Sequence, residues 1–87
     1  ELAKTGITVN AVCPGYTDTD VIADAVNTIS KASSRSKDEA LASFIAANPQ
    51  GRLVRPEEVA AAVLWIASDE AAAVNGIALP IAGGEVA

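Results

Sequence analysis

Two short runs of aliphatic and β-branched residues lie near opposite ends of the chain, and each stops at a turn that contains glycine. Residues 7–13 are Ile-Thr-Val-Asn-Ala-Val-Cys and are followed by Pro14-Gly15, and residues 77–81 are Ile-Ala-Leu-Pro-Ile and precede Gly83-Gly84. Such runs are typical of strands. We expect the first to be a mostly buried strand. We expect the second to lie at a sheet edge, because Pro80 has no N–H to donate to a ladder.

Between the two runs, the apolar residues recur at helical spacing. Ile22, Val26 and Ile29 predict a first helix from about Thr19 to Lys31. Ser36-Lys37-Asp38-Glu39 then matches a capping box, which predicts the start of a second helix. That helix should end at Asn48-Pro49, because proline disfavours helical geometry in the residue before it. The two segments together predict a helical hairpin.

A third helix is predicted after a short connector. Pro56 suits the first turn of a helix, and Glu57 and Glu58 suit its dipole, although Arg55 stands where a capping Ser, Thr or Asp is usual. Val59, Val63 and Ile66 share one face of this helix, and Trp65 lies off that face. The helix is therefore predicted to bury two sides, one of them against another subunit.

The order of these elements indicates the fold class. Residues 1–6 resemble a helix end that closes at Gly6, so the chain alternates helix, strand, helices and strand. This is the βαβ rhythm of an α/β protein with a parallel sheet. Two strands and about three helices cannot cover both faces of a doubly wound sheet. We therefore expect the remaining strands to come from elsewhere.

Composition also indicates that this is part of a larger core. Apolar residues make up 51% of the 87 residues, but many are alanine, and the large aromatic residues are only Tyr16, Phe44 and Trp65. So short a chain buries a limited share of its surface. The sequence contains no methionine, which leads us to expect a piece of a longer protein or a processed chain.

Charge and residue counts exclude several classes of function. The net charge is −5, without a cluster of Lys or Arg, so nucleic-acid binding is not expected. Cys13 is the only cysteine and histidine is absent, so neither an internal disulfide nor a Cys/His metal cluster can form. No apolar run approaches the roughly 20 residues that span a bilayer. We expect no membrane partner and a cytoplasmic location.

Several motifs carry a resemblance to a known family. They are Ile7-Thr8-Val9-Asn10-Ala11-Val12-Cys13-Pro14-Gly15-Tyr16-Thr17-Asp18-Thr19-Asp20, Gly51-Arg52-Leu53, Pro56-Glu57-Glu58-Val59-Ala60, Ala67-Ser68-Asp69-Glu70, and Asn75-Gly76 through Gly83-Gly84. In this order they resemble the C-terminal third of short-chain dehydrogenases/reductases, which have a Rossmann-like fold. Pro14 to Thr19 is most similar to 3-oxoacyl-thioester reductases and to 3-hydroxyacyl and 3-hydroxybutyrate dehydrogenases. The resemblance divides the segment into strand and nicotinamide-side loop (1–19), substrate-lid hairpin (20–50), and last helix and edge strand (51–87).

The resemblance implies which residues contact a cofactor and a substrate. Pro14 and Gly15 would turn the chain beneath the nicotinamide of NAD or NADP. The backbone of Thr17 would hydrogen-bond its carboxamide, and Thr19 would add a hydroxyl contact. Tyr16 and the helical hairpin would border a small carbonyl or alcohol substrate.

Other members of the family's machinery are missing from these 87 residues. Neither the Gly-rich phosphate loop nor the catalytic Ser is found, and Tyr16, the only tyrosine, has Asp20 rather than Lys four residues later. We expect no catalytic residue here and an inactive isolated chain. The choice between NAD and NADP, the substrate and the oligomeric state stay open.

Structural alternatives exist for several of these residues. Thr17 and Thr19 could act as a helix cap, and Cys13 could be a small buried hydrophobe without chemistry. Four acidic residues are expected to be solvated charges at helix ends: Glu57, Glu58, Asp69 and Glu70.

Three hypotheses about function follow. In the first, the parent protein is an NAD(P)-dependent oxidoreductase that interconverts a carbonyl and a secondary alcohol. In the second, the chain is a non-catalytic packing or oligomerisation module. In the third, it is an alanine-rich helical domain without strand pairing. The family resemblance also implies a homo-oligomer, a dimer or tetramer, whose interface would use residues 56–67 and 77–82.

Overall fold

A computed structural model describes residues 2–85. Along the chain the elements are η1 (Leu2–Thr5), β1 (Ala11–Pro14), α1 (Asp20–Ala32), α2 (Lys37–Ala46), α3 (Pro56–Ile66), η2 (Asp69–Ala71) and β2 (Ala78–Ile81), where η denotes a 3₁₀ helix. This order matches the predicted one, including the closing glycine Gly6, whose φ is 81°.

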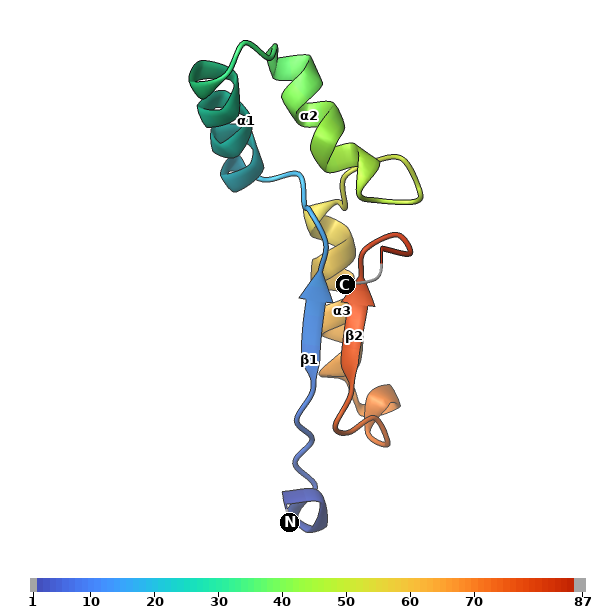
Figure 1. The fold of residues 1–87 in the computed structure, drawn as a ribbon. Coiled ribbons are helices and arrows are strands. Elements are labelled where there is room, and N and C mark those ends of the chain that lie inside the picture. The colour runs from blue at the N-terminus through green and yellow to red at the C-terminus, as the bar shows by residue number, and fades with distance from the viewer. Residues whose placement is uncertain (1, 86–87) are drawn as a thin grey trace.

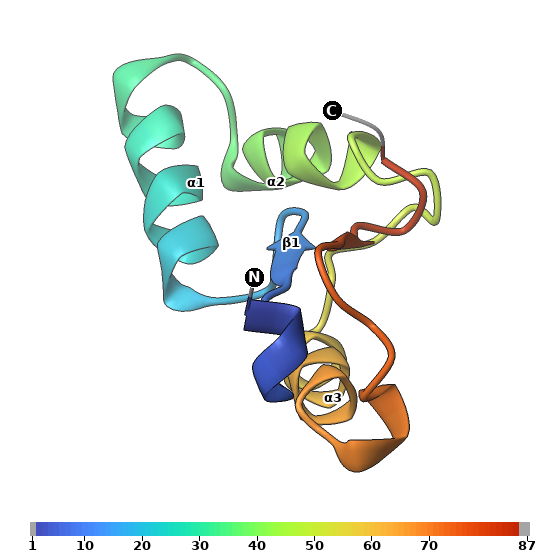
Figure 2. The ribbon, with the colours of Figure 1, turned by 90° about the horizontal axis from the view of Figure 1, so that it is seen from below.

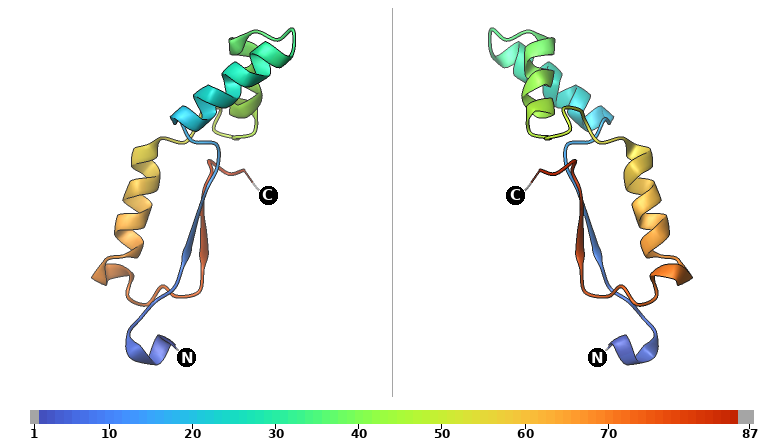
Figure 3. Two further views of the ribbon diagram at one scale, coloured as in Figure 1. Left: turned by 90° about the vertical axis from the view of Figure 1, so that its left-hand side faces the viewer. Right: turned by 90° about the vertical axis from the view of Figure 1, so that its right-hand side faces the viewer.

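The two strands form a parallel pair. Ala11 lies opposite Ala78, and Pro14 lies opposite Ile81. The chain between them includes α3, which packs on one side of the pair (Figures 1 and 3). The βαβ prediction is therefore confirmed, and the hypothesis of a helical domain without strand pairing is wrong.

One face of the strand pair is uncovered. Val12 and Leu79 are half-buried, whereas their neighbours Ala11, Cys13 and Ala78 are exposed, as expected when alternate side chains point to opposite faces. Within residues 2–85, no element covers the face opposite α3 (Figure 3). The predictions of a mostly buried first strand and of a buried Cys13 are therefore wrong for this structure.

The first strand is also shorter than predicted. At its start, asparagine side chains join the two segments beside one backbone bond, from the N–H of Gly76 to the carbonyl of Val9 at 2.9 Å. Asn75 Oδ1 accepts from the N–H of Val9 at 3.0 Å, and Asn10 Oδ1 accepts from the N–H of Ile77 at 3.1 Å. The amide nitrogen of Asn10 donates to the carbonyl of Val74 at 3.0 Å. The two asparagines thus bring the segments together before regular pairing begins at Ala11.

Helices α1 and α2 form the predicted hairpin beyond the carboxyl ends of the strands (Figure 1). The predicted capping box at the start of α2 is present: Ser36 Oγ accepts from the N–H of Glu39 at 3.1 Å, and Glu39 Oε1 accepts from the N–H of Ser36 at 3.3 Å. Seen from below, the hairpin and α3 project to different sides of the strands (Figure 2).

The chain is elongated and its core is small. Its extents are 56 × 21 × 21 Å and its radius of gyration is 16.7 Å, against about 12 Å for a compact domain of this length. The buried apolar residues among those described are Val26, Ala40, Val54 and Ala71. In the same part of the chain, no helix is long and apolar enough to cross a membrane.

Candidate functional site

The candidate site lies at the carboxyl ends of the strands, where the chain leaves β1. The N–H of Gly15 donates to the carbonyl of Ile81 at 3.0 Å. A Cβ on Gly15 would lie 3.0 Å from Cβ and 3.2 Å from Cα of Ala82. A side chain at this position would crowd the loop against the end of β2, which favours glycine; sequence reasoning did not predict this contact.

The next three residues, 16–18, are held by the connector before α3, which consists of residues 50–55. The N–H of Val54 donates to the carbonyl of Tyr16 at 2.9 Å, and the N–H of Asp18 donates to the carbonyl of Val54 at 2.8 Å. Val54 is 3% exposed, and it forms a parallel bridge with Thr17. In this pattern the N–H of Thr17 points away from Val54. Within residues 2–85 it makes no hydrogen bond, so it can donate to a ligand.

The hydroxyl groups of the two threonines do not cap α1. Thr17 Oγ1 donates to the carbonyl of Gly15 at 2.9 Å, and Thr19 Oγ1 lies 3.4 Å from the carbonyl of Thr17. Thr19 occupies the N-cap position without a capping hydrogen bond from its side chain. The helix-cap alternative is therefore wrong for both side chains, and the weakly held Thr19 hydroxyl is exposed to solvent.

Tyr16 connects this loop to the hairpin. Its ring meets that of Phe44 in α2 edge to face, with ring centroids 4.9 Å apart, a favourable aromatic geometry. Tyr16 remains 44% exposed. The ring therefore packs against the hairpin and also presents a surface to solvent, beside the loop that carries Thr17.

A second contact joins the hairpin to the end of β2. Asn48, which follows α2, is 7% exposed. Its side chain lies against Gly83, where any Cβ would overlap the amide group. Gly83 has a φ of 62°, which also favours glycine. The hairpin is thus fixed to both strands near their carboxyl ends.

Arg52 and Glu58 form an ion pair that sequence reasoning missed. Arg52 Nη1 and Nη2 donate to Glu58 Oε1 and Oε2 at 2.6 and 2.9 Å. The hydrogen bond from Arg52, together with that from the N–H of Arg55, lowers the pKa of Glu58 to about 2. The same pairing raises the pKa of Arg52. The prediction that Glu58 is only a solvated charge at a helix end is therefore wrong.

The lowered pKa of Glu58 determines the pH range in which the ion pair stabilises the fold. A depressed folded-state pKa stabilises the fold above the unfolded value, here 4.5, and that contribution is lost as the pH falls through about 2. The pair is thus fully charged at neutral pH and cannot act as a switch there.

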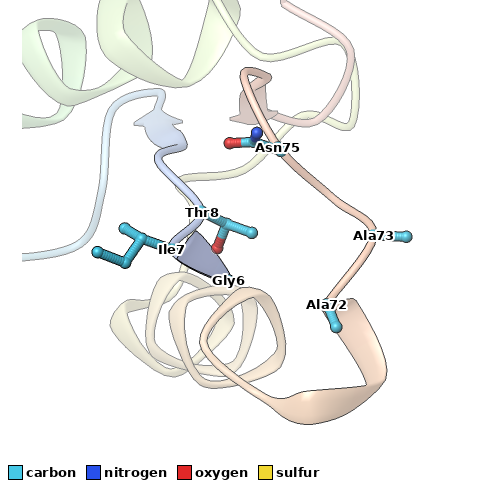
Figure 4. Close-up of a pocket in the computed structure, with 6 residues that line it drawn as sticks. All are labelled: Gly6, Ile7, Thr8, Ala72, Ala73 and Asn75. Atoms are coloured by element: carbon cyan, nitrogen blue, oxygen red, sulfur yellow. The ribbon is translucent and has the colours of Figure 1, made fainter. Parts of the chain in front are cut away.

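The structure also contains a hollow at the other end of the strands. It measures about 240 Å³ and is lined by Gly6, Ile7, Thr8, Ala72, Ala73 and Asn75 (Figure 4). No predicted site residue lines it, and its walls carry no charged side chain. Ligands of open parallel sheets bind at the carboxyl ends of the strands, so we place the candidate site at the loop after β1. The described residues contain no cluster suited to a metal ion.

A parallel strand pair with a crossover helix is the building unit of α/β folds, which include the doubly wound, Rossmann-like fold expected here. A family model described as enoyl-(acyl carrier protein) reductase matches residues 1–85. The chain belongs to the short-chain dehydrogenase/reductase family.

Individual relatives agree with this assignment. The chain is 44% identical over 84 residues to a protein assigned as the ketoacyl reductase of a monensin polyketide synthase from Streptomyces virginiae, covering 97% of this chain and 32% of that protein. It is 40% identical over 84 residues to a 3-oxoacyl-(acyl-carrier-protein) reductase of Vibrio cholerae, covering 97% of this chain and 30% of that protein.

A solved structure is also similar. The crystal structure of an actinorhodin polyketide ketoreductase with NADPH superposes with a TM-score of 0.84 at 44% identity, covering 95% of this chain and 32% of that one. The chain thus spans about a third of the length of the relatives it matches.

Proposed function

We propose that the protein carrying these residues is an NAD(P)-dependent oxidoreductase that interconverts a carbonyl and a secondary alcohol, with a 3-oxoacyl or 3-hydroxyacyl compound as substrate. The main support is the N–H of Thr17, which makes no hydrogen bond within residues 2–85 and lies where ligands meet a parallel sheet. The relatives support the same class, since two are named for ketoacyl or 3-oxoacyl reduction and a third was crystallised with NADPH.

The residues of the loop suit a nicotinamide amide. Thr17 can donate its N–H to the carboxamide oxygen, and the Thr19 hydroxyl can exchange its 3.4 Å contact for a shorter bond to the ligand. Pro14 and Gly15 set the path of the chain before these donors. When bound, the nicotinamide supplies or accepts the hydride; this loop binds and orients it.

The hairpin suits the substrate side of the site. The exposed part of Tyr16 and the neighbouring Phe44 offer apolar surface for a substrate chain, and they can exclude water once the site is occupied. We assign proton transfer to none of the described residues.

Thr19→Val tests the cofactor role. The variant removes the hydroxyl but keeps the shape, so NAD(P)H affinity should fall about 2- to 10-fold, the value of one neutral hydrogen bond. Fluorescence titration of the native protein with NADH and NADPH measures this change. Thr28→Val is a matched control, because that hydroxyl bonds only Asp24 within α1. Equal affinity in wild type and Thr19→Val would contradict the role of Thr19, and a wild type that binds neither nucleotide would contradict the proposed function.

The second candidate is a non-catalytic packing or oligomerisation module. It is supported by the outer face of α3, where Leu64 and Trp65 are 73% and 49% exposed. The two candidates differ in the nucleotide titration, because only the oxidoreductase should bind NAD(P)H.

A further inference from the structure

The carboxylate of Glu58 holds two parts of the connector that precedes α3. Its Oε1 accepts from Arg52 Nη1 at 2.6 Å and from the backbone N–H of Arg55 at 2.9 Å. Its Oε2 accepts from Arg52 Nη2 at 2.9 Å. One side chain in the first turn of α3 therefore fixes both ends of the segment 52–55.

Val54 lies inside this segment and holds the loop after β1 by two hydrogen bonds. Arg52 Nη1 also donates to the carbonyl of Leu53 at 3.1 Å, so the backbone directly before Val54 is held as well. Val54 in turn exchanges hydrogen bonds with Tyr16 and Asp18 on either side of Thr17. The bonds form a continuous path from Glu58, through 52–55, to the carbonyl of Tyr16, which shares one planar peptide group with the N–H of Thr17.

We infer that Glu58 and Arg52 are positioning residues for the nicotinamide-side loop: their clamp on 52–55 sets the place of Val54 and, through it, the orientation of the Thr17 N–H. This inference rests on the proposed function. Among the described residues, neither side chain forms a hydrogen bond with residues 14–19, so both act through Val54.

The clamp has a clear structural reason. Arg55 occupies the N-cap of α3 without a capping side chain, and Gly51, with a φ of 73°, allows the connector a conformation that other residues resist. The connector also joins the hairpin to α3, so a shift at 52–55 would carry Val54 away from the loop.

The effect on the loop can be separated from global stability. The side chains of Arg52 and Glu58 are 36% and 34% exposed, and ion pairs as exposed as this contribute little to the stability of a whole domain. Loss of the pair should therefore loosen the loop before it unfolds the protein.

Glu58→Gln tests the inference, with Glu57→Gln as the matched control because Glu57 is exposed in the same turn and makes no hydrogen bond among those described. Amide hydrogen exchange of the native protein reports on the N–H groups of Val54 and Asp18, and Ala11, bonded to Ile77, is the reference amide. In Glu58→Gln we expect exchange at Val54 and Asp18 to rise about 2- to 10-fold, while exchange at Ala11 stays at the wild-type rate. The dissociation constant for NAD(P)H should rise by a similar factor, and Glu57→Gln should change neither quantity.

Three results would overturn the inference: unchanged exchange at Asp18, an equal rise at Ala11, or faster exchange at Asp18 with unaltered nucleotide affinity. If Glu58→Gln does not fold, Arg52→Lys applies the same test, because lysine keeps the charge but loses the two-pronged contact. A wild type that binds no nucleotide contradicts the proposed function, and the cofactor part of this inference falls with it. The exchange data separate the two failures, because they test the clamp on the loop without any nucleotide.

Discussion

At the scale of single residues, Gly15 lies where the end of β1 meets the end of β2. Its neighbour across the pair, Ala82, precedes Gly83, which is itself fixed against Asn48. The glycine is explained by packing as well as by any ligand.

Gly15→Ala should destabilise the protein. A methyl group 3.0 Å from Ala82 Cβ is an overpacked contact, and such contacts cost about 1–3 kcal/mol. The reduced entropy of the unfolded chain offsets about 0.4–1 kcal/mol of that cost. We expect a net loss of roughly 1 kcal/mol in the free energy of unfolding, measured by urea denaturation.

A double-mutant cycle with Ala82→Gly provides the control. If the clash is the cause, the double variant should recover part of the loss, because the Cβ of Ala82 is then gone. Strictly additive effects would show that the contact with Ala82 is not responsible.

Single residues also show the limit of the sequence. The side chains of Asn10 and Asn75 each accept a hydrogen bond from the backbone of the opposite segment, yet more than 60 residues separate them. Arg52 and Glu58 belong to the motifs at residues 51–53 and 56–60, but their pairing depends on how the connector turns. A residue type and its local spacing do not reveal a partner that only the fold brings close. The predicted ligand contacts stay predictions for a related reason: the ligand is another partner that the sequence does not contain. They involve Pro14, Gly15, Tyr16, Thr17 and Thr19.

At the scale of elements, local signals predicted the helices well. The Ser36 capping box and Pro56 at the start of α3 act within a few residues, so the sequence contains all their determinants. Both strands were placed correctly, but the first was predicted to be mostly buried and to begin at Ile7, whereas β1 is largely exposed and begins at Ala11. Burial and strand length depend on neighbouring strands, which no local pattern specifies.

Ser36→Ala should weaken α2. It removes the hydroxyl that accepts from the N–H of Glu39, and the loss of such a cap costs about 1 kcal/mol. We expect a lower free energy of unfolding and faster amide exchange at Glu39. Ser34→Ala, in the exposed turn before α2, is the control and should leave both unchanged. Equal changes in the two variants would contradict a specific capping role.

At the scale of the whole molecule, few apolar side chains are buried and two apolar surfaces are exposed. The outer side of α3 and the uncovered face of the strand pair both present apolar residues, and no large side chain among those described is fully buried. The sequence predicted this need for neighbours from the abundance of alanine, and it predicted the parallel topology from element order. We propose that the rest of the fold covers the sheet face and that a second subunit covers α3.

Trp65→Glu tests the predicted subunit contact. A carboxylate in an apolar interface must be desolvated, so we expect the native protein to dissociate to smaller species in size-exclusion chromatography with light scattering. Val21→Glu is the matched control, because Val21 is also an exposed apolar residue, at 75%, but lies in α1. The same molar mass for wild type and Trp65→Glu would remove α3 from the interface.

The parallel pairing of β1 with β2 has a consequence for the order of folding. Asn10 and Ile77, which bond where the strands meet, are 67 residues apart, and closing so long a loop carries an entropic cost before any contact rewards it. The hairpin, by contrast, is assembled from residues close together in the sequence and can form early. The loop after β1 is pinned by Val54 and by the end of β2, so it acquires its shape only when these distant segments arrive. We therefore expect the loop proposed to hold the nicotinamide to reach its folded conformation last.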